Sequence, residues 1–261
     1  MSKCDVCDED LSKIYLNLNV YSHFEFRQIY KKRKVYYEEC NSCKLIYNKN
    51  FFKNNIFKSK SYILSNQTKQ KKIKFYNKNI NRAELQSKKF YKFISTKKSP
   101  SILDIGSFDG LLLKEIKKRI NSKNYNLVGY DINKDLLKNY DKSIKFFTSL
   151  EKLFEFKYDL IILSHSIMYI DDLKKILSLI RNNLNFDGTL VIQFSNLDKR
   201  PMNLLLADQY IFPSDFSLNF IFNKYNLRSK KLTSEYFNND NILIFNRKFN
   251  DKAIYNTNLS L

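Results

Sequence analysis

The alternation of apolar and polar positions predicts an α/β protein from residue 101 onward. Short apolar runs typical of buried strands are separated by segments in which apolar residues recur with helical spacing. The predicted strands are 101–105, 126–132, 144–149, 158–164 and 189–194, the predicted helices are 110–120, 172–184 and 216–227, and 229–237 with 241–248 form a closing pair of strands. Strand and helix in alternation favour a parallel doubly wound sheet, which binds ligands at the carboxyl ends of its strands.

The residues before this pattern divide the chain further. Residues 1–50 alternate in places as strands do and are predicted to form a small ribbon, and 67–94 carries a ragged apolar helical face. We therefore expect four parts: the ribbon 1–50, a basic helical connector 51–98, a core domain 99–250 and a tail 251–261.

Four cysteines in two C-x2-C pairs indicate a metal site in the ribbon. Cys4 and Cys7 are separated by 32 residues from Cys40 and Cys43. Two such knuckles complete a closed tetrahedral shell of four thiolates, which suits a structural Zn²⁺, and a segment this small needs the metal to fold. The alternative is four unrelated buried thiols. His23 is interpreted as an ordinary strand residue.

The stretch "SILDIGSFDG" (101–110) places two of the chain's four glycines in one turn. The dinucleotide pattern G-x-G-x-x-G is absent, and Asp104 and Asp109 would repel a pyrophosphate but suit a cationic ligand. Asp131 follows the next strand, where an acid can accept the hydroxyls of a ribose. A ribose with a positive charge and no phosphate describes S-adenosylmethionine (SAM). The alternative is a tight turn that binds no ligand.

"LDIGSFDG" and "VGYDI" resemble motifs I and II of the class I SAM-dependent methyltransferases, and "FDGTLVIQF" resembles their fifth-strand segment. The "GSxDG" form together with paired C-x2-C knuckles is similar to the zinc-containing sugar C-methyltransferases. This resemblance implies a Rossmann-like seven-stranded core preceded by a zinc ribbon, without that branch's large C-terminal domain. The cofactor-binding residues that it implies are Asp104 for the methionine amino group, Asp131 for the ribose, and Gly106, Ser107, Gly110, Ile132 and Ser164.

The segment "LSHSIMYIDD" (163–172) follows the fourth strand, which in this fold borders the methyl donor. Transfer to carbon or oxygen usually needs a base that works near neutrality, and His165 is the only histidine outside the ribbon. His165 and Tyr169 are therefore the candidate catalytic residues. The alternative is that His165 is a structural residue hydrogen-bonded to backbone at the end of the strand.

The segment expected to bind the acceptor differs from that of the sugar C-methyltransferases. Residues 207–218 lack the two histidines and the glutamate of the sugar branch, and Asp208 and Tyr210 are either acceptor contacts or loop residues. The expected function is methyl transfer to a small molecule, namely a sugar or nucleotide-sugar of surface polysaccharide biosynthesis. Two alternatives stay open: an RNA methyltransferase and a non-catalytic SAM-binding scaffold.

Charge and hydropathy bear on partners and location. The net charge is +20, and residues 27–98 contribute +18 of it, from 21 basic and three acidic residues. That excess is either a solvated face that follows from composition or a phosphate-binding surface for RNA. The sequence opens on no signal peptide and has no apolar run long enough to span a bilayer, so we expect a cytoplasmic protein.

Overall fold

The structure is a computed structural model of the chain, and it describes residues 3–20, 33–48, 69–134, 140–170, 172–206, 209–233 and 237–249. Contacts group the chain into two compact units. The first comprises Met1–Lys53, His165–Arg181 and Ile192–Leu261, and the second comprises Asn54–Ser164 and Asn182–Val191. The predicted tail, the connector up to residue 68, His23 and Asp208 lie outside the described residues.

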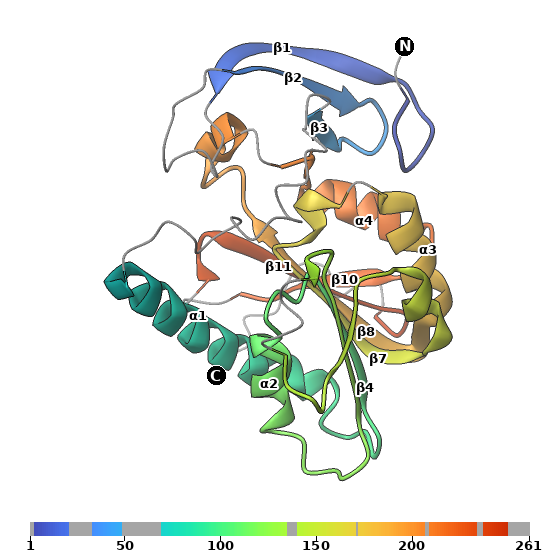
Figure 1. Ribbon diagram of the computed structural model, residues 1–261. Coiled ribbons are helices and arrows are strands. Elements are labelled where there is room, and N and C mark those ends of the chain that lie inside the picture. Colours follow the sequence, from blue (N-terminus) through green and yellow to red (C-terminus); the bar gives the residue numbers. More distant parts are fainter. Residues whose placement is uncertain are drawn as a thin grey trace. The chain divides into compact units, whose positions relative to one another are not determined.

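The second unit contains the parallel part of a sheet (Figure 1). Strand β4 pairs in parallel with β5 and β7, and β5 pairs in parallel with β6. The elements of this unit are α1 (Lys69–Phe90), η3 (Tyr91–Phe93), β4 (Ser101–Ile105), α2 (Leu111–Lys117), β5 (Asn126–Tyr130), β6 (Lys145–Phe147), η5 (Glu151–Glu155) and β7 (Tyr158–Ser164). Six of the seven residues of β7 are buried, as expected for a central strand covered on both faces.

The first unit brings the N-terminal segment together with segments from the later chain. Its four-stranded sheet has the order β1-β2-β3-β9, and β10 pairs with β11 in antiparallel fashion. Its elements are β1 (Leu11–Val20), β2 (Arg33–Cys40), β3 (Ile46–Asn48), η6 (Ile167–Tyr169), η7 (Pro201–Leu206), β9 (Ile211–Phe212), α4 (Asp215–Asn223), β10 (Arg228–Lys231) and β11 (Asp240–Asn246). Helix α3 (Leu173–Asn183) and strand β8 (Leu184–Ser195) each have residues in both units.

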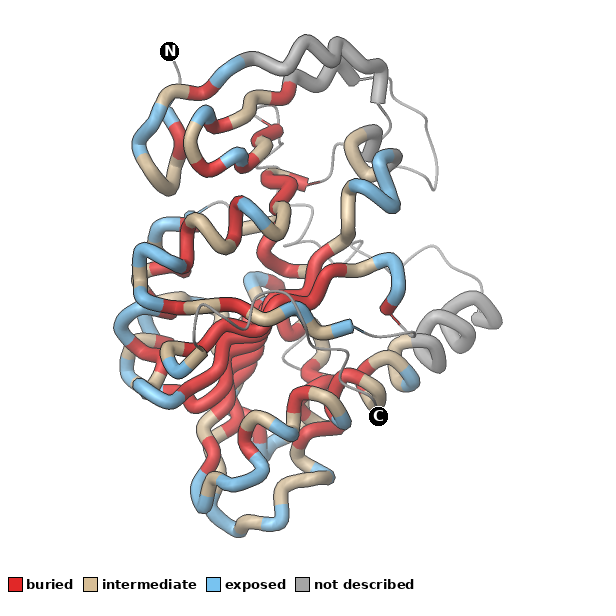
Figure 2. The backbone as a smooth tube through the Cα atoms, turned by 180° about the vertical axis from the view of Figure 1, so that it is seen from behind, coloured by how far each residue is buried: buried red, intermediate tan, exposed pale blue. Residues whose placement is uncertain are grey.

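The complete main sheet has seven strands in the order β10-β11-β8-β7-β4-β5-β6. This order, parallel strands and closing antiparallel pair confirm the predicted Rossmann-like α/β fold. Buried residues follow the strands of the sheet (Figure 2), where Leu103, Val128, Ile161 and Val191 are fully buried. No helix among the described residues is long and apolar enough to cross a bilayer.

The predicted start of strand β8 is wrong. The sequence predicts that "NFDG" (185–188) ends the preceding helix and that the strand begins at Thr189, but β8 already begins at Leu184. The side chain of Asn185 donates to Asp159 of β7 at 2.9 Å, which holds the early part of β8. Asn183, the last residue of α3, donates to the carbonyls of Phe154 and Phe156, so a tertiary contact ends the helix.

A second difference is β9, which the sequence interpretation treats as part of a loop. Its two residues pair with β3 in the register Ile46↔Phe212 and Tyr47↔Ile211. A strand of two residues carries no periodicity of its own, and it forms here because β3 offers an edge to pair with. The N-terminal ribbon is therefore completed by a strand from the later chain.

Candidate functional site

The turn between β4 and α2 has the backbone of a glycine-rich loop, although one of its residues is aromatic. Gly106 and Gly110 have φ angles of 77° and 73°, and Phe108 between them has φ 50°. A side chain in this left-handed region costs roughly 1–2 kcal/mol. Phe108 thus adopts, at that cost, a backbone conformation that suits glycine, so the turn has the left-handed backbone of a glycine-rich loop.

Asp104 is the most buried acid of this turn. Its side chain lies in β4, the residue is 3% exposed, and no described residue donates a hydrogen bond or offers a cation to its carboxylate. Burial, together with the charges of Asp131 and Asp109, raises the pKa of Asp104 to about 7. A buried acid without a positive partner favours a cationic ligand.

Asp131 follows β5 and is fixed by two backbone groups. The N–H of Asn133 donates to its Oδ1 at 2.9 Å, and the N–H of Phe108 donates to its Oδ2 at 3.1 Å. Burial raises the pKa of Asp131 in spite of these bonds. Each carboxylate oxygen still has capacity to accept from a hydroxyl, as a ribose would require. Next to it, Ile132 is 38% exposed and offers an apolar surface.

Tyr140 is a residue of this site that sequence reasoning missed. Its hydroxyl and that of Ser107 are hydrogen-bonded to each other, and the Ser107 hydroxyl also approaches the carbonyl of Tyr130 at 3.3 Å. A Cβ placed on Gly110 would lie 2.8 Å from the Tyr140 ring, and one on Gly129 would lie 2.2 Å from its hydroxyl. These two glycines thus admit the tyrosine, and burial raises its pKa above the usual range.

Ser164, the last residue of β7, is also in this unit. Its hydroxyl accepts from the side-chain amide of Gln86 on α1 at 2.7 Å. The predicted cofactor residues Asp104, Gly106, Ser107, Gly110, Asp131, Ile132 and Ser164 all belong to the second unit. An uncompensated buried acid, a left-handed turn and a fixed second acid fit SAM: Asp104 would hold the ammonium and Asp131 the ribose.

His165 and Tyr169 lie in the first unit, after the end of β7. His165 has φ 55°, its N–H donates to the carbonyl of Gln193 at 2.8 Å, and its Nε2 lies 3.0 Å from Oδ2 of Asp240. Gln193 donates to the same carboxylate oxygen at 2.7 Å. Tyr169 ends η6. Asp240 and Gln193 carry no motif, and their distance along the chain from His165 hides the arrangement from the sequence.

The four cysteine sulfurs of Cys4, Cys7, Cys40 and Cys43 lie within 4.8 Å of one another. Cys4 and Cys43 are separated by 3.7 Å, and Cys7 and Cys40 by 3.3 Å. Zinc–sulfur bonds of about 2.3 Å in a tetrahedron place the sulfurs about 3.8 Å apart, so the cluster fits a Zn²⁺. With all four positions taken by sulfur, such an ion would hold structure.

The two knuckles have matching backbones. The N–H of Asp8 donates to the carbonyl of Cys4 at 3.1 Å, and the N–H of Lys44 donates to the carbonyl of Cys40 at 3.0 Å. Asp8 and Lys44, each directly after the second cysteine of its pair, have φ angles of 61° and 57°. Each pair therefore forms the same tight turn, which points its two sulfurs to one place.

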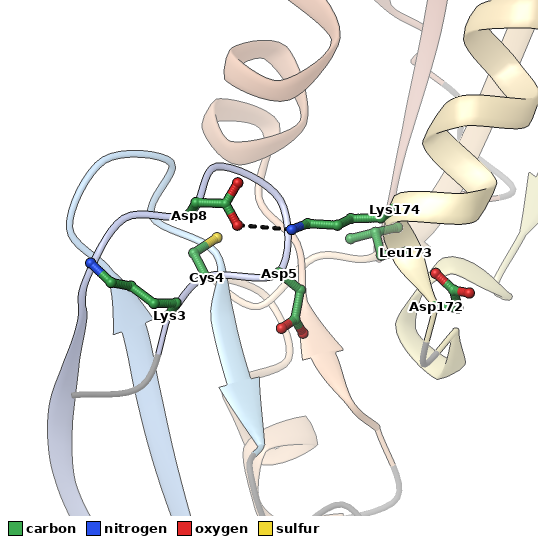
Figure 3. A pocket seen from close by; sticks show the side chains of 7 residues that line it. All are labelled: Lys3, Cys4, Asp5, Asp8, Asp172, Leu173 and Lys174. Atoms are coloured by element: carbon green, nitrogen blue, oxygen red, sulfur yellow. Dashed lines mark hydrogen bonds and ion pairs between the residues drawn. The ribbon is translucent and has the colours of Figure 1, made fainter.

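A cavity of about 590 Å³ lies beside the first knuckle (Figure 3). Its lining residues are Lys3, Cys4, Asp5, Asp8, Asp172, Leu173 and Lys174. Lys174 and Asp8 form an ion pair of 2.8 Å across it, between the knuckle and the start of α3. Most of the charged residues that line this cavity are exposed, and we assign it no ligand.

The chain is similar to several known proteins. A family model described as a methyltransferase domain matches residues 75–229. A search of curated proteins gave no match. Among solved structures, an O-methyltransferase family protein from Burkholderia thailandensis has a TM-score of 0.51 and 12% identity, and the match covers 66% of this chain and 58% of that one.

Two further solved structures are similar. A protein from Pyrococcus horikoshii OT3 has a TM-score of 0.50 and 17% identity over 66% of this chain and 91% of its own. A SAM-dependent methyltransferase from Archaeoglobus fulgidus has a TM-score of 0.49 and 19% identity over 62% of this chain and 93% of its own. The Burkholderia and Pyrococcus structures share the fold of this chain.

We expect the purified protein to contain one Zn²⁺ per chain, because four sulfurs converge and the ribbon has little core of its own. Elemental analysis measures the content, and Cys40→Ser should lower both metal content and thermal stability. Ser178→Ala, on α3 and outside the cluster, serves as a control with unchanged metal. Full metal content in Cys40→Ser would contradict the assignment.

Replacing Asp131 by Ala should weaken SAM binding about 30- to 150-fold, because a charged acceptor of two hydroxyls contributes roughly 2–3 kcal/mol. Isothermal titration with SAM measures the affinity. Asp141→Ala is the control, since that acid lies shortly before β6 and bonds Ser143 and Lys117 instead. Parental affinity in Asp131→Ala would remove Asp131 from the site.

The affinity for SAM should fall as pH drops below about 7, by up to about tenfold per pH unit, because a bound cation needs Asp104 ionised. The same titration run between pH 5.5 and 8 measures this dependence. Asp104→Asn should bind weakly, and its affinity should lack this dependence. An affinity in the parent that does not change below pH 7 would argue against a cation at Asp104.

Asp104→Asn should also be more stable than the parent at high pH. The folded pKa of Asp104 is raised, so its favourable contribution is present below about pH 4 and is lost as pH rises through about 7. The advantage of the variant should grow from pH 5 to pH 8 by on the order of 2–3 kcal/mol. Urea unfolding at both pH values measures it, and a constant difference would contradict the burial argument.

Proposed function

The chain belongs to the methyltransferase-domain family and is a SAM-dependent methyltransferase, and we propose that it uses His165 as a base to methylate a small molecule of the sugar or nucleotide-sugar class. The observation that carries the proposed base is the contact between His165 and Asp240. An acceptor hydroxyl or carbon acid must lose a proton as it receives a methyl group, and a base held in place serves that need.

SAM supplies a methyl group on a positively charged sulfur when it is bound. The protein's own residues then have separate roles. Asp104 and Asp131 bind and orient the methyl donor, and the glycine turn lets the backbone approach it. His165 is proposed to accept the proton that the acceptor releases.

Asp240 fixes the state of the His165 ring. Its Oδ2 already accepts from the side-chain amide of Gln193, and only an ionised carboxylate accepts well from two donors at once. In the neutral ring His165 would then carry its proton on Nε2, and Nδ1 is the nitrogen proposed to take a proton. The arrangement follows the logic by which a buried acid selects the tautomer of a catalytic histidine.

The backbone supports this role. His165 holds a left-handed conformation, which a residue with a side chain adopts when surrounding bonds determine it. Its N–H bonds the carbonyl of Gln193, the same residue whose side chain bonds Asp240. Three groups thus fix both the chain and the ring of His165. A histidine that merely ended β7 would need only the backbone bond.

The sugar class comes from the resemblance of the glycine turn and the cysteine pairs to the zinc-containing sugar C-methyltransferases. A screen with labelled SAM tests it against nucleotide sugars and against RNA at two salt concentrations. Methylation of a nucleotide sugar supports the proposal. Methylation of RNA, at a rate that falls steeply as salt rises, would contradict the proposal and support an RNA methyltransferase, because counterion release makes RNA binding salt-dependent.

With the acceptor identified, His165→Ala should lower kcat by roughly 10²- to 10⁴-fold and leave SAM affinity nearly unchanged. Asp240→Asn should lower kcat less, and it should move the midpoint of the pH–rate profile, measured at saturating SAM, to lower pH because a negative charge is lost. Asp198→Asn, an exposed acid of the same unit, is the control. If His165→Ala kept the parental turnover, His165 would not be the base, and that role would fall to Tyr169 or to the substrate itself.

A further inference from the structure

The cysteine cluster is connected by direct contacts to the turn that follows His165. The first contact is the hydroxyl of Tyr47, which lies 3.1 Å from Sγ of Cys4. A metal-bound cysteine carries no proton, so Tyr47 would be the donor. Tyr47 is fully buried on β3, and its hydroxyl therefore has a fixed position relative to the sulfur.

The second contact joins Tyr47 to Tyr210. Their rings meet edge to face, with centroids 5.8 Å apart and an interplanar angle of 71°. The Tyr210 hydroxyl is hydrogen-bonded to the carboxylate of Asp5, which lies between the two cysteines of the first knuckle. Tyr210 is thus attached to the knuckle both through Tyr47 and through Asp5.

The third contact leads to η6. The N–H of Tyr210 donates to the carbonyl of Met168 at 2.8 Å, and its own carbonyl accepts from the N–H of Asn48 at 2.8 Å. Met168 is the middle residue of η6, which begins two residues after His165 and ends at Tyr169. The backbone of Tyr210 therefore connects the ribbon to the segment that carries both candidate catalytic residues.

We propose that Tyr210 is a positioning residue for methyl transfer: it holds η6 against the metal-bearing knuckle, so that the metal governs the placement of His165. This inference rests on the proposed role of His165. A metal that only folds the ribbon would not affect catalysis. The proposed role predicts instead that loss of the Tyr210 contacts lowers turnover while SAM binding is retained. The residues proposed to bind SAM belong to the other unit.

The test begins with hydrogen exchange in the parent protein, with and without a chelator. Removal of the metal should speed exchange at the amides of Tyr210 and of residues 167–170, and leave residues 101–106 unchanged. This measurement needs no acceptor and decides the linkage even if His165 proves not to be the base. Equal exchange at Tyr210 in both states would overturn the inference.

The second arm uses Tyr210→Phe, which keeps the ring but loses the hydroxyl on Asp5. SAM affinity should stay within about twofold, whereas kcat should fall about tenfold or more, since small misplacements of a catalytic group are costly. Tyr225→Phe is the matched control: Tyr225 belongs to the same unit, and the guanidinium of Arg181 lies over its ring at 5.9 Å from the centroid. Equal kcat in Tyr210→Phe and in the control would overturn the inference.

A double variant separates positioning from general stability. If Tyr210 acts through His165, then adding Tyr210→Phe to His165→Ala should change kcat by less than about twofold, because the two effects are not additive. A further fall equal to that of the single variant would mean that Tyr210 acts by another route and would overturn the proposal. Tyr47→Phe gives an independent check: its metal affinity should fall about 10- to 100-fold, as for other groups that bond a metal ligand.

Discussion

The uncompensated charge of Asp104 is the constraint around which the donor-binding end of the sheet is arranged. The chain places an acid in a fully covered part of β4, adds Asp109 and Asp131 nearby, and supplies no described cation to balance Asp104. An arrangement selected for stability alone would pair this acid or replace it. The strain of Phe108 lies in the same turn, so two unfavourable features coincide at one place. Such coincidence is expected where a ligand completes the interactions.

Much of this end of the sheet could be predicted from sequence because it depends on local patterns. Apolar runs identified the bounds of β4 and β7 to the residue. Parallel pairing of β4 with β5 places Asp104 beside Gly129, two residues before Asp131. The role of Tyr140 could not be predicted. It is one of 18 tyrosines, and only the packing of its ring over two glycines distinguishes it from the others.

The ribbon shows a different limit of prediction. The spacing of its cysteines indicates a metal site without any knowledge of the fold, since two C-x2-C pairs suffice to surround one ion. Its sheet, however, is completed by β9, and Tyr37 bonds the carbonyl of Leu204 and packs on Phe212. A ribbon with so little core gains buried contacts from the later chain. The metal-binding segment and the segment after β8 are therefore parts of one unit, which the predicted boundary at residue 50 does not convey.

The distribution of roles between the two units has a consequence for acceptor choice. The residues proposed to bind the methyl donor come from β4, the turn after it and the end of β5, all in one unit. The proposed base, its partner Asp240 and the knuckle contacts of Tyr210 belong to the other. Substitutions among the proposed acceptor-side residues would therefore fall in a different unit from the buried acid and the glycine turn. Residues 209–212 lack the histidines and glutamate of the sugar branch, yet Tyr210 there bonds both Asp5 and Met168. In the proposed mechanism this segment would serve as a structural link to η6, and His165, held by Asp240, would accept the proton that methylation of oxygen or carbon releases.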